Sequence, residues 1–272
     1  MNKALVSSIF LIPISVFAAS TTTVRQGDVA FIEMQNDCYK SSLVIPKLGT
    51  YPILTFQNKK LVTVPIDLYQ ATGTYSIPKC VKKEATSTLT IISREKEVEE
   101  FIIPKEQGGN SSDNASKVKK EIQNDSRVLN VFSNKKQLWS KPFAYPVKEV
   151  TVTDTYGYSR DSSGVNIVHK GLDFKADIGT PVYAMNRGVV RYVGILPTYG
   201  RTVIIDHGRG IQTVYLHLSK VLVKEGSLIQ RSQMLGRAGN TGFVTGPHLH
   251  LSIRVLGISV DPENFMKSLG GK

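Results

Sequence analysis

The chain has 272 residues, 41% of them hydrophobic, which is enough for one or two domains with a sizeable core and excludes a disordered protein. The formal net charge is +12, but basic residues occur only in short, scattered pairs such as Lys82-Lys83, with no aromatic residues interleaved. This pattern argues against a nucleic-acid partner. Two explanations fit the positive charge equally well: attraction to an anionic polymer or membrane surface, and a basic surface that is merely solvated.

The first residues have the features of an export signal. Lys3 supplies positive charge, residues 4–17 are largely apolar, and Ala18 offers a small residue for cleavage. Residues 1–19 are therefore predicted to be a signal peptide, with an uncleaved anchor as the alternative. No later run approaches the roughly 20 apolar residues of a membrane span, so no integral span is expected after signal removal.

Export gives meaning to the two cysteines, Cys38 and Cys80, because disulfides persist in oxidising compartments. We expect these cysteines to pair. The alternative is two separate buried thiols.

Residues 20–105 are predicted to form a small, β-sandwich-like N-terminal domain. Short β-prone segments at 29–34, 42–45, 61–66 and 87–92 are separated by turn residues. The region contains no recognisable catalytic motif, and its role is unassigned.

Residues 106–142 are predicted to link this domain to a second one. The stretch 106–114 is polar and rich in Gly, Ser and Asn, which indicates an exposed loop. Apolar residues at loosely helical spacing between 116 and 139 predict one or two short helices.

Residues 143–272 are predicted to form an antiparallel β-sheet domain with a groove on one face. Strands are expected at 188–194, 201–206, 212–218 and 248–255, separated by Gly-rich turns, and long helical periodicity is absent. The predicted fold class of the whole chain is therefore mainly β.

All five histidines lie in this last region, between residues 169 and 250. A catalytic zinc takes three His, Asp or Glu ligands and keeps one position open for water, so His169, Asp173 and the run His248-Leu249-His250 indicate a zinc hydrolase. Along 248–255 the even positions are polar and the odd ones aliphatic, which places both histidines of that run on one strand face. The same alternation over 213–218 predicts His217 on a polar face with Tyr215.

Three motifs resemble the lysostaphin-type (LytM-like) zinc metallopeptidases, which are exported bacterial peptidoglycan endopeptidases. The first motif is His169-Lys170-Gly171-Leu172-Asp173-Phe174. The second is Val203-Ile204-Ile205-Asp206-His207-Gly208 leading to Tyr215-Leu216-His217-Leu218-Ser219. The third is Gly239-Asn240-Thr241-Gly242 followed by Thr245-Gly246-Pro247-His248-Leu249-His250. The resemblance covers about residues 143–265.

The resemblance implies a set of site residues. His169, Asp173 and His250 would be the ligands of one Zn²⁺ per chain, and His217 and His248 the catalytic residues beside the open coordination position. Which of these two is the general base stays open. Tyr199 and Asn166 are weaker candidates for the substrate groove, and Tyr199 also suits an ordinary hairpin turn. His207 is interpreted as structural.

The resemblance also implies the substrate. We expect zinc-dependent hydrolysis of peptide cross-links in peptidoglycan, with D-alanyl bonds preferred, so the partners would be peptidoglycan peptide stems. The alternative is a non-enzymatic activator of a cell-wall amidase. The expected location is the periplasm of a Gram-negative bacterium, or otherwise the outside or the wall of the cell. The N-terminal domain is expected to position the peptidase on the wall or to cover part of the groove.

Overall fold

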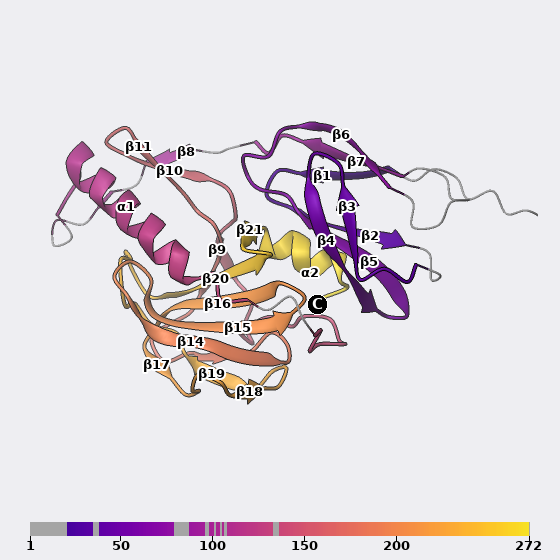
Figure 1. Cartoon of the computed structure of the whole chain (residues 1–272). Coiled ribbons are helices and arrows are strands. Elements are labelled where there is room, and N and C mark those ends of the chain that lie inside the picture. The colour runs from indigo at the N-terminus through magenta and orange to yellow at the C-terminus, as the bar shows by residue number, and fades with distance from the viewer. Residues whose placement is uncertain are drawn as a thin grey trace, which may run out of the picture.

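The computed structural model describes residues 21–34, 38–78, 87–95, 98–100, 102–103, 105, 108–132 and 136–271. The predicted signal peptide and Cys80 lie outside these residues. The described chain is mainly β, as predicted, with the N-terminal strands and the C-terminal strands in two adjacent groups (Figure 1). No helix in these ranges is long and apolar enough to cross a membrane.

The N-terminal group forms two packed sheets. One contains β1 (Thr21–Arg25), β7 (Ser87–Ile92) and β6 (Gly73–Ile77), and the other contains β2 (Val29–Met34), β5 (Lys59–Pro65), β4 (Gly49–Phe56) and β3 (Ser42–Ile45). Alternate apolar residues such as Ile32, Val62 and Leu89 meet in a shared core, as expected for a sandwich. Cys38 is buried there, and its pairing with Cys80 stays a prediction.

The C-terminal group is built on an eight-stranded sheet. In spatial order it contains β18 (Leu228–Ile229), β14 (Gly188–Leu196), β15 (Gly200–Gly208), β16 (Ile211–Leu218), β20 (His248–Val255), β12 (Leu172–Lys175) and β9 (Val152–Asp154), and β21 (Ile258–Val260) pairs with β20. A three-stranded sheet contains β13 (Pro181–Tyr183), β19 (Met234–Arg237) and β17 (Lys220–Val221). The short helix α2 (Pro262–Ser268) follows β21.

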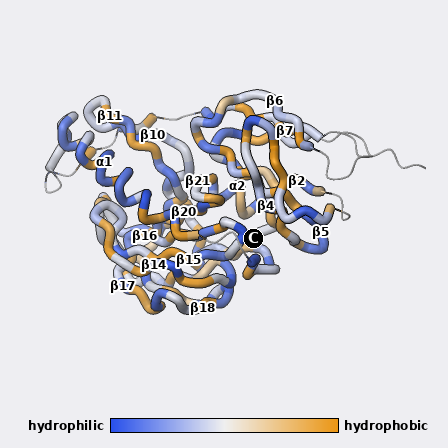
Figure 2. The backbone as a smooth tube through the Cα atoms, viewed as in Figure 1, coloured by the Kyte–Doolittle hydropathy of each residue, from blue (hydrophilic) through white to orange (hydrophobic). Residues whose placement is uncertain are grey.

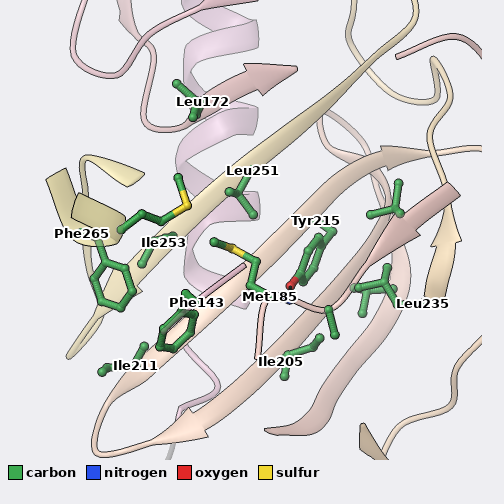
Figure 3. Close-up of a cluster of buried hydrophobic side chains, with 14 of the residues drawn as sticks. Phe143, Leu172, Met185, Ile205, Ile211, Tyr215, Leu235, Leu251, Ile253 and Phe265 are labelled. Carbon is green, nitrogen blue, oxygen red and sulfur yellow. Dashed lines mark hydrogen bonds between the residues drawn. The ribbon is translucent and has the colours of Figure 1, made fainter. Parts of the chain in front are cut away.

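The large sheet has two different faces, which we call the core face and the groove face. On the core face Leu251 and Ile253 of β20, Tyr215 of β16 and Ile205 of β15 pack around Met185 (Figure 3). The groove face carries the even-numbered residues of β20, including both of its histidines. The alternation in the sequence therefore predicted the two faces of this strand correctly.

The alternation predicted for β16 is wrong. Directly opposed residues share a sheet face, and Tyr215 pairs with Leu251 whereas Leu216 pairs with His250. Tyr215 therefore lies on the core face and Leu216 on the groove face. The pattern misled because apolar clusters bury both faces of this strand, so polarity does not mark the solvent side.

His217 nevertheless reaches the groove face, because of a β-bulge. The pairing with β15 shifts between Val203, opposite Tyr215, and Arg201, opposite Leu218, which leaves one extra residue on β16. His217 itself has a φ of 59°, and its backbone N–H donates to the Tyr199 carbonyl at 2.9 Å. The local bend re-aims a side chain that regular alternation would send into the core.

The segment between the two groups does more than join them. Strand β8 (Val98–Glu100) pairs in parallel with β10 (Ser159–Ser162), which also pairs with β11 (Val165–Val168). In the described part of this segment one helix follows, α1 (Ser112–Val128), whose first turn is capped by the Ser111 hydroxyl accepting from the Asn114 N–H at 3.2 Å. In Figure 2 hydrophilic residues occupy much of α1.

The N-terminal sandwich and the C-terminal group share an interface. Val29, Leu54 and Phe56 of the sandwich join the main core of the C-terminal group, where Phe56 contacts Trp139 at 5.3 Å between ring centroids. The 143–272 and 20–105 boundaries stay predictions, but the two units are packed together rather than loosely tethered.

Arg94 ties this interface electrostatically. One of its side-chain nitrogens, Nη2, lies 2.6 Å from Asp28 Oδ1 in the sandwich and 2.9 Å from Asp261 Oδ2 at the start of α2. All three side chains are less than 10% exposed. A single guanidinium thus neutralises two buried carboxylates contributed by the two units.

Candidate metal centre

Two strands and a loop bring His169, Asp173 and His250 together on the groove face. Asp173 on β12 is directly opposite His250 on β20, and His169 enters from the loop after β11. Asp173 Oδ1 lies 2.7 Å from His250 Nδ1 and 3.2 Å from His169 Nε2, and the two nitrogens are 3.1 Å apart. These three atoms therefore converge on one point and can hold a metal ion.

Hydrogen bonding fixes which nitrogen of His169 faces that point. Its Nδ1 donates to the Thr155 carbonyl at 2.6 Å, so the neutral ring keeps a lone pair on Nε2. Burial lowers the pKa of His250, although the adjacent Asp173 opposes this shift. Burial alone would raise the pKa of Asp173, but His169 and His250 hold it well below its usual range. A neutral imidazole and an ionised carboxylate are the ligand forms that metals require.

The donor set fits zinc. Asp173 Oδ1 is buried and, within the described ranges, has no hydrogen bond of acceptable geometry despite its close nitrogens, which is the environment of a cation ligand. Tetrahedral zinc with bonds of about 2.0–2.1 Å would separate its ligand atoms by about 3.3 Å. The observed separations of 2.7–3.2 Å need only a small expansion.

Gly171 makes room for this set. A Cβ at this position would lie 2.2 Å from His250 Nε2 and 2.6 Å from the Leu251 carbonyl oxygen. The glycine between the two ligands of the first motif therefore permits β12 and β20 to approach each other. The sequence analysis quoted this residue without giving it a role.

Gly171→Ala is expected to weaken zinc binding by at least about tenfold, the lower end of the effect of disturbing residues that orient a metal ligand. Competition with a chromophoric chelator measures the affinity. Gly246→Ala is the matched control, since a Cβ there meets nothing within 4 Å and the affinity should not change. Equal affinities of the two variants would contradict the steric role of Gly171.

His217 and His248 stand beside the ligand set. Their ring centroids are 4.9 Å apart, and the His217 centroid is 6.0 Å from that of His250. His217 Nδ1 donates to the Thr241 carbonyl at 2.8 Å and His248 Nδ1 to the Gly246 carbonyl at 2.9 Å. Each neutral ring therefore presents a lone pair on Nε2. Burial, with contributions from His248 and His250, lowers the pKa of His217 to about 3.

His207 lies elsewhere, in the core. It is fully buried, its Nδ1 donates to the Arg187 carbonyl at 2.9 Å, and its Nε2 lies 2.8 Å from the Thr213 hydroxyl. Burial lowers its pKa to about 4, outweighing the hydrogen bond to Arg187. These contacts fit the structural role predicted for it.

The burial of His207 has a consequence for stability. Its pKa is about 4 when folded and about 6.5 when unfolded, so between these values the unfolded chain binds the additional proton. Stability is therefore fully present above pH 6.5 and falls by about 3 kcal/mol as the pH drops to 4. Urea unfolding across this range measures the slope. His207→Gln should be less stable at neutral pH but should flatten the slope, and an unchanged slope would exclude His207 as its source.

The two weaker candidates line a groove next to the ligand set. The groove has a volume of about 1030 Å³ and includes all four site histidines, Asp173, Tyr199 and Asn166. The Tyr199 hydroxyl lies 3.0 Å from the Ser126 hydroxyl of α1, so the helix covers this side chain. From the N-terminal sandwich, Tyr69 reaches the rim of the groove.

Other groove residues were not predicted from the sequence. Arg160 Nη2 lies 3.6 Å from Asp173 Oδ2 and 3.3 Å from Asp154 Oδ1, and its Nε donates to the Tyr158 hydroxyl at 2.7 Å. Asp154 is directly opposite Asp173 in the sheet, so Arg160 offsets the repulsion between two adjacent carboxylates. A charged strand residue on β10 carries no local signal of this role.

A His-Asp-His set with two further histidines on an open sheet face defines a mononuclear metal centre of the hydrolytic kind. Residues 167–262 match the model of peptidase family M23. The match contains all five site residues and excludes the N-terminal sandwich and α1.

Curated relatives are also similar to part of this chain. Peptidoglycan DD-endopeptidase ShyA of Vibrio cholerae is 50% identical over 100 residues, which cover 37% of this chain and 23% of the relative. Peptidoglycan DD-endopeptidase ShyB of the same organism is 40% identical over 121 residues, covering 43% and 28%. The chain thus spans less than a third of the length of either relative.

One solved structure resembles nearly the whole chain. A crystal structure from Pseudomonas aeruginosa, provisionally described as a peptidase M23, has a TM-score of 0.60 and covers 89% of this chain and 95% of its own. Its sequence is 22% identical to that of this chain, so the similarity concerns the fold alone. That fold includes the arrangement of the sandwich beside the peptidase domain.

Proposed function

We propose that this protein is a zinc-dependent endopeptidase that hydrolyses peptide cross-links in bacterial peptidoglycan, with D-alanyl bonds as the preferred target. The observation that carries the proposal is the convergence of His169, Asp173 and His250 within an M23 domain, with His217 and His248 beside them. The named activity of the DD-endopeptidase relatives supports the choice of substrate.

In this proposal His169 Nε2, Asp173 Oδ1 and His250 Nδ1 hold the metal. Bound zinc supplies Lewis acidity, which lowers the pKa of water to about 7 and polarises a carbonyl group. The ionised Asp173 offsets part of the positive charge, and Arg160 holds its second oxygen in place.

The two remaining histidines, His217 and His248, act on the attacking water. His248 is 19% exposed and lies 3.8 Å from Asp173 Oδ2, so it can carry a transient positive charge beside a carboxylate. His217 is more deeply buried, and this burial disfavours a charged ring and lowers its pKa. We therefore assign proton uptake to His248 Nε2, while neutral His217 accepts a hydrogen bond at Nε2 and orients the attacking water.

The test is digestion of purified sacculi by the zinc-loaded protein. The proposal expects cross-linked muropeptide dimers to decrease and monomers to increase, with a chelator stopping the reaction and zinc restoring it. Unchanged dimers with the zinc-loaded protein would overturn it. An amidase activator would instead increase the release of free peptides, and only when an amidase is present. The intact His-Asp-His set does not favour this alternative.

Peptidoglycan as substrate also bears on location. We propose that residues 1–19 direct export to the periplasm of a Gram-negative cell and that Cys38 and Cys80 form a disulfide there. Non-reducing peptide mapping of protein isolated from that compartment tests both points, since it identifies the first mature residue and the cysteine pairing.

A further inference from the structure

Helix α1 lies outside the M23 match, yet it forms one side of the groove. Lys119, Ile122, Gln123 and Ser126 of α1 line the same cavity as the metal-site residues. Their spacing of three, four and seven residues puts them on one stripe of the helix. The adjacent stripe, containing Ala115, Val118 and Asp125, is buried and attaches α1 to the rest of the molecule.

The attachment of α1 is strong near the metal centre. Asp125 Oδ2 accepts from the Thr198 backbone N–H at 2.8 Å and from the Thr198 hydroxyl at 2.5 Å, and both residues are buried. Leu129, just after the helix, packs against Ile204 and Leu216 on the groove face. A buried, hydrogen-bonded carboxylate and an apolar anchor suit a fixed wall better than a displaceable cover.

Space remains between this wall and the metal residues. The groove of about 1030 Å³ is lined from both sides, so α1 does not fill it. A second hollow adjoins it at the other end of the helix and shares Lys119, Gln123 and Asn166 with the groove. Within the described ranges, the side chains of these three residues have no hydrogen-bond or ion-pair partner.

The charges of the groove favour an acidic peptide. Beyond the metal-site carboxylate Asp173 and the pair formed by Asp154 and Arg160, the described residues of its lining include the cations Lys119, Lys170, Lys175 and Arg254 but one acid, Glu100. Lys119 is the cation that α1 contributes, and it is partly buried with no counterion among the residues that the structure describes. A carboxylate of a bound peptide would supply that counterion.

We propose that α1 is a substrate-binding wall and that Lys119 pairs with a carboxylate of the acidic peptide in the groove. The inference rests on the proposed peptidase function. From Ser126, which contacts Tyr199 beside the metal centre, to Lys119 the helix rises about 10 Å. An extended peptide covers that length in about three residues. Lys119 would therefore contact the substrate about three residues away from the scissile bond.

The test compares Lys119→Ala with Lys117→Ala, which removes the same charge from an exposed position on the opposite side of α1. The substrates are a purified D-alanyl cross-linked muropeptide dimer and a short N-acylated D-alanyl-D-alanine peptide. For the dimer, Lys119→Ala should raise KM about fivefold at unchanged kcat, as expected for one partly exposed ion pair. Lys117→Ala should match the parent, Lys119→Arg should restore KM, and the short peptide should not discriminate.

Binding of the same dimer to zinc-free protein, measured by calorimetry, separates this inference from the proposed function. If the zinc-loaded parent cleaves neither substrate, the proposed function fails. Even then, weaker dimer binding by Lys119→Ala but not by Lys117→Ala would support the role of α1 as a substrate-binding wall. Equal KM and equal binding for the Lys119 and Lys117 variants would overturn the inference. So would faster hydrolysis by Lys119→Ala, which would identify α1 as an inhibitory cover.

Discussion

Replacing His250 by alanine is expected to abolish both zinc binding and hydrolysis, whereas replacing His217 is expected to abolish hydrolysis and leave zinc bound. His250 Nδ1 is within 3.1 Å of both other ligand atoms, so its loss leaves two ligands for the metal. Zinc affinity should fall by more than the roughly 10–100-fold seen when only a supporting residue changes. Metal analysis after dialysis, together with muropeptide turnover, measures both effects.

The His217 variant separates metal binding from the catalytic step. The His217 ring lies beside the ligand set and bonds to the Thr241 carbonyl, so His217→Ala should keep one zinc per chain. Turnover should fall by about a hundredfold or more, the cost of misplacing a reacting group, because the attacking water would lose the Nε2 acceptor that orients it. Loss of zinc from His217→Ala, or retention of zinc and activity by His250→Ala, would contradict the assigned roles.

Replacing Arg94 by alanine is expected to destabilise the protein by about 3–5 kcal/mol, the cost of leaving buried charges without their partner. Asp28 and Asp261 would both lose their counterion at the interface between the sandwich and the peptidase domain. Denaturant unfolding at fixed zinc concentration measures the change.

Lys59→Ala provides the control for this prediction. Lys59 pairs with Glu33 at 2.8 Å, but both side chains are 57% exposed, so its removal should cost at most about 1 kcal/mol. Similar losses for the two variants would mean that Arg94 does not couple the units electrostatically.

The part of the site most readable from the sequence is β20. Its polar and aliphatic residues alternate because one face packs in the core and the other faces the groove, so His248 and His250 could be placed together. Asp173 and His169 came from the motif and its family resemblance. The register that puts Asp173 directly opposite His250 depends on tertiary pairing of β12 with β20, which alternation alone does not specify.

The route of His217 to the site could not be read in the same way. Regular alternation would send it to the core face with Tyr215, and only a bulge together with a positive φ turns it towards His248. Such bulges depend on the pairing between two strands rather than on one strand's composition.

The contribution of the intervening segment to the groove could also not be predicted from the sequence. Its polar composition predicted a linker, and residues 116–139 predicted helix, but the helical stripe of Lys119, Gln123 and Ser126 looks like any solvated face. Only the tertiary structure, in which Asp125 and Leu129 anchor α1 beside the large sheet, shows that this stripe lines a groove.

The measurement that tests the central claim most directly is digestion of a purified D-alanyl cross-linked dimer in ¹⁸O-labelled water, followed by mass spectrometry. Hydrolysis at the cross-link predicts two monomers, with one ¹⁸O atom in the carboxyl group newly formed on the D-alanyl residue and none in the other product. The label should appear with zinc-loaded protein and be absent with His250→Ala. An intact dimer, or a label elsewhere in the products, would contradict a zinc-dependent D-alanyl endopeptidase.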